Sequence, residues 1–144
     1  SYSSDHTRVR WLLTVKAKAG DASYGLLVGK GTANVTPDDY KLSQPFSEGS
    51  DVDQLAHGET SVEAVAVQNS SILFRIVRTF TNNYSEAQTV NEVGVVARGI
   101  AYIRDSGDEW YNKDIRILLA RDVLGSSVNI PSGSTLTARY IFKC

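Results

Sequence analysis

The feature that most constrains this chain is a series of strand-type segments that fills its second half. They cover residues 71–80, 89–97, 115–124 and 134–142, and short polar or glycine-containing stretches separate them. These segments are rich in residues that favour strands, and the pattern holds no helical period longer than a turn or two. The pattern therefore predicts an all-β fold.

The first half adds two more strands and an irregular stretch. Residues 8–18 alternate, with Leu13 among the apolar residues of one face and cations on the other, as in a half-buried strand. Residues 24–30 form a second, more apolar segment. Farther on, Thr36 is placed to cap a short helix, and residues 47–58 are expected to form an exposed loop.

Together these segments predict a two-sheet antiparallel β-sandwich of about eight strands, with jelly-roll or immunoglobulin-like connections. A closed barrel is the alternative. Residues 105–108 carry turn chemistry and predict a hairpin between two strands. The polar residues 1–7 predict a flexible N-terminal arm, and residues 8–144 a single domain that is long enough to bury a core.

Charge and hydropathy limit the partners of this chain. The formal net charge of -1 gives no general attraction to nucleic acid or to an anionic membrane. The apolar runs are too short to span a bilayer, and the single cysteine, Cys144, cannot form an internal disulfide. We therefore expect neither nucleic acid nor a membrane as a partner.

Two stretches resemble ligand-binding loops, and each has a plainer explanation. Residues 25–32 superficially match a phosphate-binding loop, but the glycine spacing is one residue short and no long helix is expected to follow. The acids Asp105, Asp108 and Glu109 would suit calcium, yet they lack the regular spacing of a calcium loop. A strand that ends in a glycine-rich turn and a solvated hairpin tip explain these residues better.

Catalytic signals are weaker still. The only imidazoles, His6 and His57, are expected in the arm and in a loop, so a shared metal site is not expected. The chain has no G-x-S-x-G elbow, and we find no serine placed with a base and an oriented acid. The sequence therefore predicts a protein that is not an enzyme and that uses no cofactor and no metal.

The best candidate for a binding site is a pair of adjacent aromatic residues. Trp110 and Tyr111 follow the turn at 105–108, and Tyr84 joins them if the loops cluster at one end of the sandwich. Exposed aromatic rings can stack on sugar rings or on a partner protein. Trp110, Tyr111 and Tyr84 are thus candidate contacts to a partner or to a host-surface glycan. The alternative is that Trp110 packs over the end of the sandwich.

Five stretches also carry a family resemblance: residues 29–42, 78–83, 89–95, 118–124 and 128–140. In these stretches and their order, the chain resembles a widespread group of structural proteins from tailed bacteriophages. These are small virion β-sandwich proteins of the tail-appendage or capsid-surface (decoration) type. The resemblance covers most of the chain and implies a structural role, but it carries over no functional residues.

The leading hypothesis is a non-enzymatic virion structural protein that self-assembles as a homo-oligomer or decorates the capsid or tail, after assembly in the host cytoplasm. Its partners would be copies of itself and other virion proteins. Residues 1–7 would cross to a neighbouring subunit. The alternative hypothesis is a glycan- or receptor-binding module of a phage tail or fibre, with Trp110 and Tyr111 as its platform.

Overall fold

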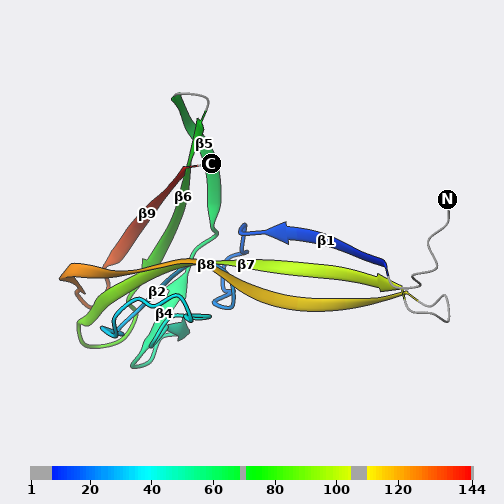
Figure 1. Ribbon diagram of the computed structural model, residues 1–144. Helices are drawn as coiled ribbons and strands as arrows, with labels where there is room; N and C mark the ends of the chain where they lie inside the picture. Colours follow the sequence, from blue (N-terminus) through cyan, green and yellow to red (C-terminus); the bar gives the residue numbers. More distant parts are fainter. Residues whose placement is uncertain (1–7, 69–70, 105–109, 144) are drawn as a thin grey trace, which may run out of the picture.

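The computed structural model describes residues 8–68, 71–104 and 110–143, which form nine β-strands and no helix (Figure 1). The described part of the chain therefore offers no apolar helix that could cross a membrane. The strands are β1 (Arg8–Thr14), β2 (Gly25–Gly29), β3 (Ser47–Glu48), β4 (Gln54–His57), β5 (Ser61–Gln68), β6 (Ser71–Thr81), β7 (Gln88–Arg104), β8 (Trp110–Ile130) and β9 (Thr135–Lys143).

The strands form two sheets, each built around one long strand. In the first sheet, β7 pairs along its length with β8, and its other edge pairs with β2 and then with β1, all antiparallel. In the second sheet, β6 pairs with β9 on one edge and with β5 and β4 on the other. The short β3 extends this sheet by parallel pairing with β4. The antiparallel pairing of β7 with β8 on both sides of residues 105–109 agrees with the predicted hairpin, although its tip lies outside the described residues.

The two sheets pack face to face over an apolar core, which confirms the all-β, two-sheet prediction and is consistent with a β-sandwich. From the first sheet, Leu26 and Val95 face this core, and from the second sheet Ile76 does so. A second cluster continues it with Val28 and Phe80. We call the region around these residues the base, and the face of each sheet that points to this core its inner face.

The outer face of the first sheet is covered by the chain itself. Leu42, from the long segment between β2 and β3, packs there with Leu27 and Val96. Its Cδ1 atom lies only 2.6 Å from the point that a Cβ atom on Gly94 would occupy. Gly94 thus lets the segment approach the strand closely, as the position of a glycine within a strand pattern suggests.

Beyond the base, the two sheets separate into two projections (Figure 1). The first arm consists of residues 8–14, 98–104 and 110–116, which are the far parts of β1, β7 and β8. The second arm consists of residues 61–68, 71–77 and 139–143, from β5, β6 and β9. The arms point in different directions, so their inner faces do not cover each other.

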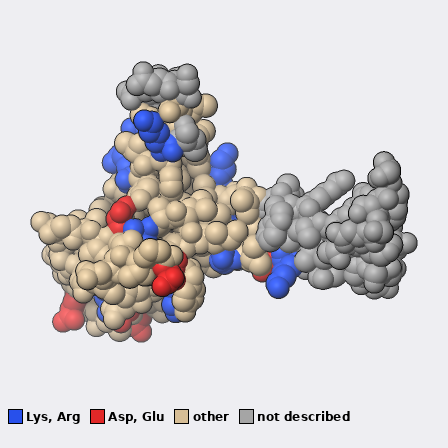
Figure 2. All heavy atoms as spheres, viewed as in Figure 1, with Lys and Arg blue, Asp and Glu red and all other residues tan. Residues whose placement is uncertain are grey.

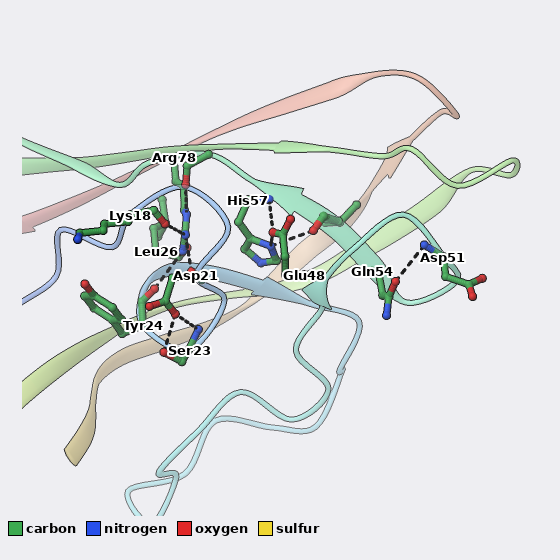
Figure 3. A network of polar contacts seen from close by, with 12 residues as sticks. Lys18, Asp21, Ser23, Tyr24, Leu26, Glu48, Asp51, Gln54, His57 and Arg78 are labelled. Atoms are coloured by element: carbon green, nitrogen blue, oxygen red, sulfur yellow. Dashed lines mark hydrogen bonds and ion pairs between the residues drawn. The ribbon is translucent and has the colours of Figure 1, made fainter. Parts of the chain in front are cut away.

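Arg78 fixes the place where the sheets meet (Figure 3). Its side chain comes from β6, is almost fully buried, and donates hydrogen bonds of 2.5–3.3 Å to carbonyl oxygens instead of a carboxylate. The acceptors are the main chains of Gly58, Tyr24, Leu26, Lys18 and Asp21. One guanidinium thus binds the second sheet to β2 and to the turn before it.

Two local predictions in the first half were wrong. Thr36 does not cap a helix: the segment makes a single turn in which Asp39 N–H donates to the Thr36 carbonyl and the Asp39 carboxylate bonds back to Thr36. Residues 47–58 are not simply an exposed loop, because they include β3 and β4 and bury Leu55 and His57. The apolar side of this short segment completes the core under Phe80.

We expect Arg78→Lys to lower the free energy of unfolding by about 3 kcal/mol, because a lysine cannot satisfy the same fork of carbonyls. Urea unfolding followed by circular dichroism measures the change. The control is Arg75→Lys in the same strand, where the exposed ion pair with Glu63 is worth less than about 1 kcal/mol. Equal losses in both variants would contradict the role given to Arg78.

Candidate functional site

The most deeply buried charge in the described part of the first sheet is Glu92 of β7, which is fully covered. Its carboxylate accepts hydrogen bonds from the N–H groups of Gly31, Ser43 and Gln44 at 2.7–2.8 Å and from Arg121 Nε at 2.9 Å. Burial alone would raise the pKa of Glu92, but the bonds from Gln44, Arg121 and the other amides outweigh it and hold the pKa below its usual value.

Arg121 of β8 completes this network on the other side. Its Nη1 atom lies 3.0 Å from the Asp39 carboxylate, and its Nη2 atom donates to the Ala33 carbonyl at 2.8 Å. Each charge of the trio therefore has several partners within the chain. The network ties the segment between β2 and β3 to the outer face of the first sheet, and it leaves no free acid or base for catalysis among these three residues.

The same contacts explain the stretch that resembles a phosphate-binding loop. Residues 25–29 form β2, and the Gly31 N–H group that follows donates to Glu92. Main-chain amides do bind an anion here, but the anion is a carboxylate of the same chain. The plainer interpretation, a strand that ends in a glycine-rich turn, agrees with the structure.

His57 is the one buried histidine that the structure describes. Its Nδ1 atom lies 2.9 Å from both the Glu48 carboxylate and the Leu55 carbonyl, and its ring packs edge-on against Phe80 (Figure 3). The Nε2 atom is buried without a hydrogen-bond partner in the described structure. Burial lowers the pKa of His57 and outweighs the opposing effect of Glu48, so the ring is neutral near pH 7.

The described residues show no group of three or more acids, histidines or cysteines that could hold a metal ion. The proposed calcium ligands Asp105, Asp108 and Glu109 lie outside the described residues, as do His6 and Cys144. No metal centre is therefore assigned on residues 8–68, 71–104 and 110–143.

The predicted aromatic platform is divided by the fold. Tyr84 lies half-buried before the start of β7 and accepts a hydrogen bond from Ser132 through its carbonyl. Trp110 and Tyr111 begin β8 opposite Arg104 and Ile103, at the other end of β7. The main chain thus separates Tyr84 from the pair. The side chains of Trp110 and Tyr111 lie outside the described residues, so the glycan contact stays a prediction.

What the described surface does offer is apolar area on the inner faces of both arms. On the first arm, Leu13 pairs with Gly99 across from Ile115, and the Leu13 side chain is 58% exposed. Leu13 and Ile115 lie over the middle strand, since both come within about 3 Å of the point that a Cβ atom on Gly99 would occupy. Ile117 extends this half-buried row toward the base.

The second arm has a matching surface made of larger side chains. Phe74 of β6 pairs with Phe142 of β9, and Tyr140 packs against Phe142 with ring centroids 5.0 Å apart. Ile72, one alternation beyond Phe74, is 41% exposed. These residues continue the inner face that Ile76 occupies at the base: Tyr140 and Phe142 are partly buried against the core there, and Ile72 is left exposed farther out.

The outer face of the first arm is polar by contrast. Arg98 and Arg116 both bind the Asp114 carboxylate, and both guanidinium groups lie within 6.0 Å of the Tyr24 ring. Hydrogen bonds to these two arginines lower the pKa of Asp114, with that to Arg98 contributing most. The charges therefore satisfy one another on the solvent side, while the apolar side lacks a partner.

Comparison with protein-family models, with curated proteins and with solved structures found no match for this chain.

Sequence reasoning missed the residues that organise the structure, although a signal was present. Arg78 lies between Ile76 and Phe80 in the alternation of one strand, so it shares their inward face. Glu92 likewise shares its face of β7 with Gly94 and Val96. A charged residue on a covered face must find partners inside the fold, and that requirement marks both residues as buried anchors.

We expect Glu92→Gln to lower the free energy of unfolding by about 3 kcal/mol, because it removes the buried charge that pairs with Arg121 and accepts the three main-chain N–H groups, and leaves Arg121 with the Asp39 carboxylate alone. Hydrogen exchange should rise selectively in residues 31–44, which the carboxylate holds. The matched control is Glu63→Gln, which removes an exposed ion pair. Unchanged exchange in residues 31–44 would show that Glu92 does not anchor this segment.

His57 should make stability depend on pH. The folded-state pKa is lowered from 6.5, so the unfolded chain binds the proton first. Stability is therefore present above pH 6.5 and falls as the pH drops below it, by at most about 1.4 kcal/mol per pH unit. Unfolding measured at pH 8 and pH 5 should show this slope in the wild type and in His6→Gln, and a reduced slope in His57→Gln. An identical slope in all three proteins would refute the assignment.

Proposed function

We propose that this chain is a non-enzymatic structural protein of a virion that assembles with copies of itself. One observation carries the proposal: the two sheets separate beyond the base, and the apolar inner faces of the arms are left only partly covered, with Leu13 and Ile72 exposed. A sheet with one apolar face is stable when a second layer covers that face. A chain that does not supply its own second layer is suited to obtaining it from a neighbour.

The polar groups support a structural role. Glu92, Arg121 and Arg78 are fully engaged in holding segments of the chain together. The neutral ring of His57 binds Glu48 and Leu55, with no hydroxyl or thiol among its described partners. The buried charges of the described residues thus serve the architecture.

The virion part of the proposal rests on the resemblance to structural proteins of tailed bacteriophages. Its partners are then further copies of the chain and other proteins of the capsid or tail. In this proposal, the two packed sheets are a variant of the jelly-roll or immunoglobulin-like sandwich in which the layers separate at one side. Such a variant gives each subunit two surfaces for its neighbours.

The test is the mass of the purified chain in solution by light scattering, with electron microscopy of the same sample. We expect closed oligomers or filaments, because each copy exposes apolar surface that association removes from water. A protein that stays monomeric at high concentration, both alone and with a crowding agent that promotes association, would contradict self-assembly.

A further inference from the structure

We propose that the first arm of one copy forms the missing second layer over the second arm of the next copy, so that copies join head to tail. The proposal rests on the self-assembly proposed above and names its surface. Leu13 and Ile115 of one copy would face Ile72, Phe74 and Phe142 of its neighbour.

The apolar area that the arms leave open is seen in single side chains. Leu13 is 58% exposed on the first arm, and Ile72 is 41% exposed on the second. A contact between the two inner faces removes both from water, which favours association.

The base shows what kind of layer each arm lacks. There, the inner face of the first sheet lies against the inner face of the second, with Leu26 and Val95 on one side and Ile76 on the other. The same two sheets continue into the arms with the same alternation, so Leu13 follows the inward row of the first sheet and Phe74 that of the second. The layer absent from each arm is thus the kind of sheet that the other arm provides.

The shapes of the two inner faces favour contact between a first arm and a second arm over contact between two arms of the same kind. The inner face of the first arm is recessed in the middle, because its central strand carries Gly99 at an inward position between Leu13 and Ile115. The second arm is high in the middle, because Phe74 and Phe142 lie side by side there. Two low faces would leave voids and two high faces would clash, whereas a low face and a high face interdigitate at interior density.

Charge is compatible with a second copy as the partner. Arg98, Arg116 and Asp114 pair on the outer face of the first arm, so a contact through the inner face leaves this network intact. Lys113 lies at an inner-face position beside Ile115, near the outer end of the described part of the arm. The acidic side chains gather mainly on the base, whereas Lys and Arg mark the second arm (Figure 2). A net charge of -1 gives little repulsion between copies. The described inner faces are mainly apolar, with the single cation Lys113 beside Ile115, so they offer no cluster of cations that would select a nucleic acid or an anionic surface instead.

Head-to-tail contact is heterologous, so it closes into a ring or continues as a filament. In a ring, the first arm of each copy packs on the second arm of one neighbour, and its second arm receives the first arm of the other neighbour. Every apolar inner face is then buried by a single type of contact. A symmetric contact between like arms would need two different interfaces to reach the same result.

The experiment is cysteine cross-linking between two variants in a Cys144→Ser background. Leu13→Cys and Ile72→Cys both alter exposed side chains, so the fold should be retained, and circular dichroism checks this. A short bis-maleimide should link the two variants into a dimer when they are mixed and should link neither variant to itself. The double variant should give a ladder of linked chains.

The matched control is Val52→Cys, an equally exposed apolar position on the base, mixed with Leu13→Cys. It should give no link above the background of random collision. Dimers in each single variant alone would show contact between like arms and would overturn the head-to-tail arrangement. Equal linking by Val52→Cys would overturn the assigned surface.

A second variant separates the surface from the proposed function. Leu13→Asp should weaken association by about tenfold or more in Kd, since it places a charge in the apolar contact. Val52→Asp should leave association unchanged. If the wild type is monomeric, both the proposed function and this inference fail. If it assembles, but Leu13→Asp assembles equally well and no link joins positions 13 and 72, only the inferred surface fails.

Discussion

The structure depends on one buried cation. Arg78 lies on the inner face of the second sheet, between the apolar Ile76 and Phe80, and it binds main-chain carbonyls from β2 and the turn before it. A buried guanidinium without these acceptors would be strongly unfavourable. The acceptors can reach it only if the first sheet lies directly over it. Arg78 therefore sets the line at which the sheets are held together, and beyond that line no comparable interaction within the described chain prevents them from separating.

The second polar anchor decides which faces stay open. Glu92 and Arg121 hold the segment between β2 and β3 on the outer face of the first sheet, where Leu42 and Val96 pack under it. That face is thus covered within one chain. The long connection of the first half is used up on the outside and cannot also cover the inner faces of the arms. The apolar surface of the arms stays exposed because the segment between β2 and β3 covers the outer face of the first sheet instead.

The alternation of residues predicted more of the fold than of the site. In the second half it located β6 and β9 closely, because one face of each strand is apolar and a shift by one residue would invert it. It could not predict the separation of the sheets. Residues such as Leu13 and Ile72 have the pattern of core residues whether the second layer comes from the same chain or from a neighbour. Only the positions of the two sheets distinguish these cases, and they depend on contacts such as those of Arg78 between segments remote in sequence.

The free edges of the sheets support the same conclusion as their faces. β8 is 21 residues long, and no strand of the described chain pairs with its second edge. Long free edges invite strand pairing, but this one is interrupted where its register with β7 shifts, and it carries the charges Arg116 and Asp122. Bulges and charges are the means by which natural sheets prevent pairing at an edge. The free edge of β8 is thus protected against strand pairing, whereas Leu13 and Ile72 leave apolar area on the inner faces of the arms. Of the two ways in which sheets associate, the described surface therefore favours packing of one face on another over pairing of edges.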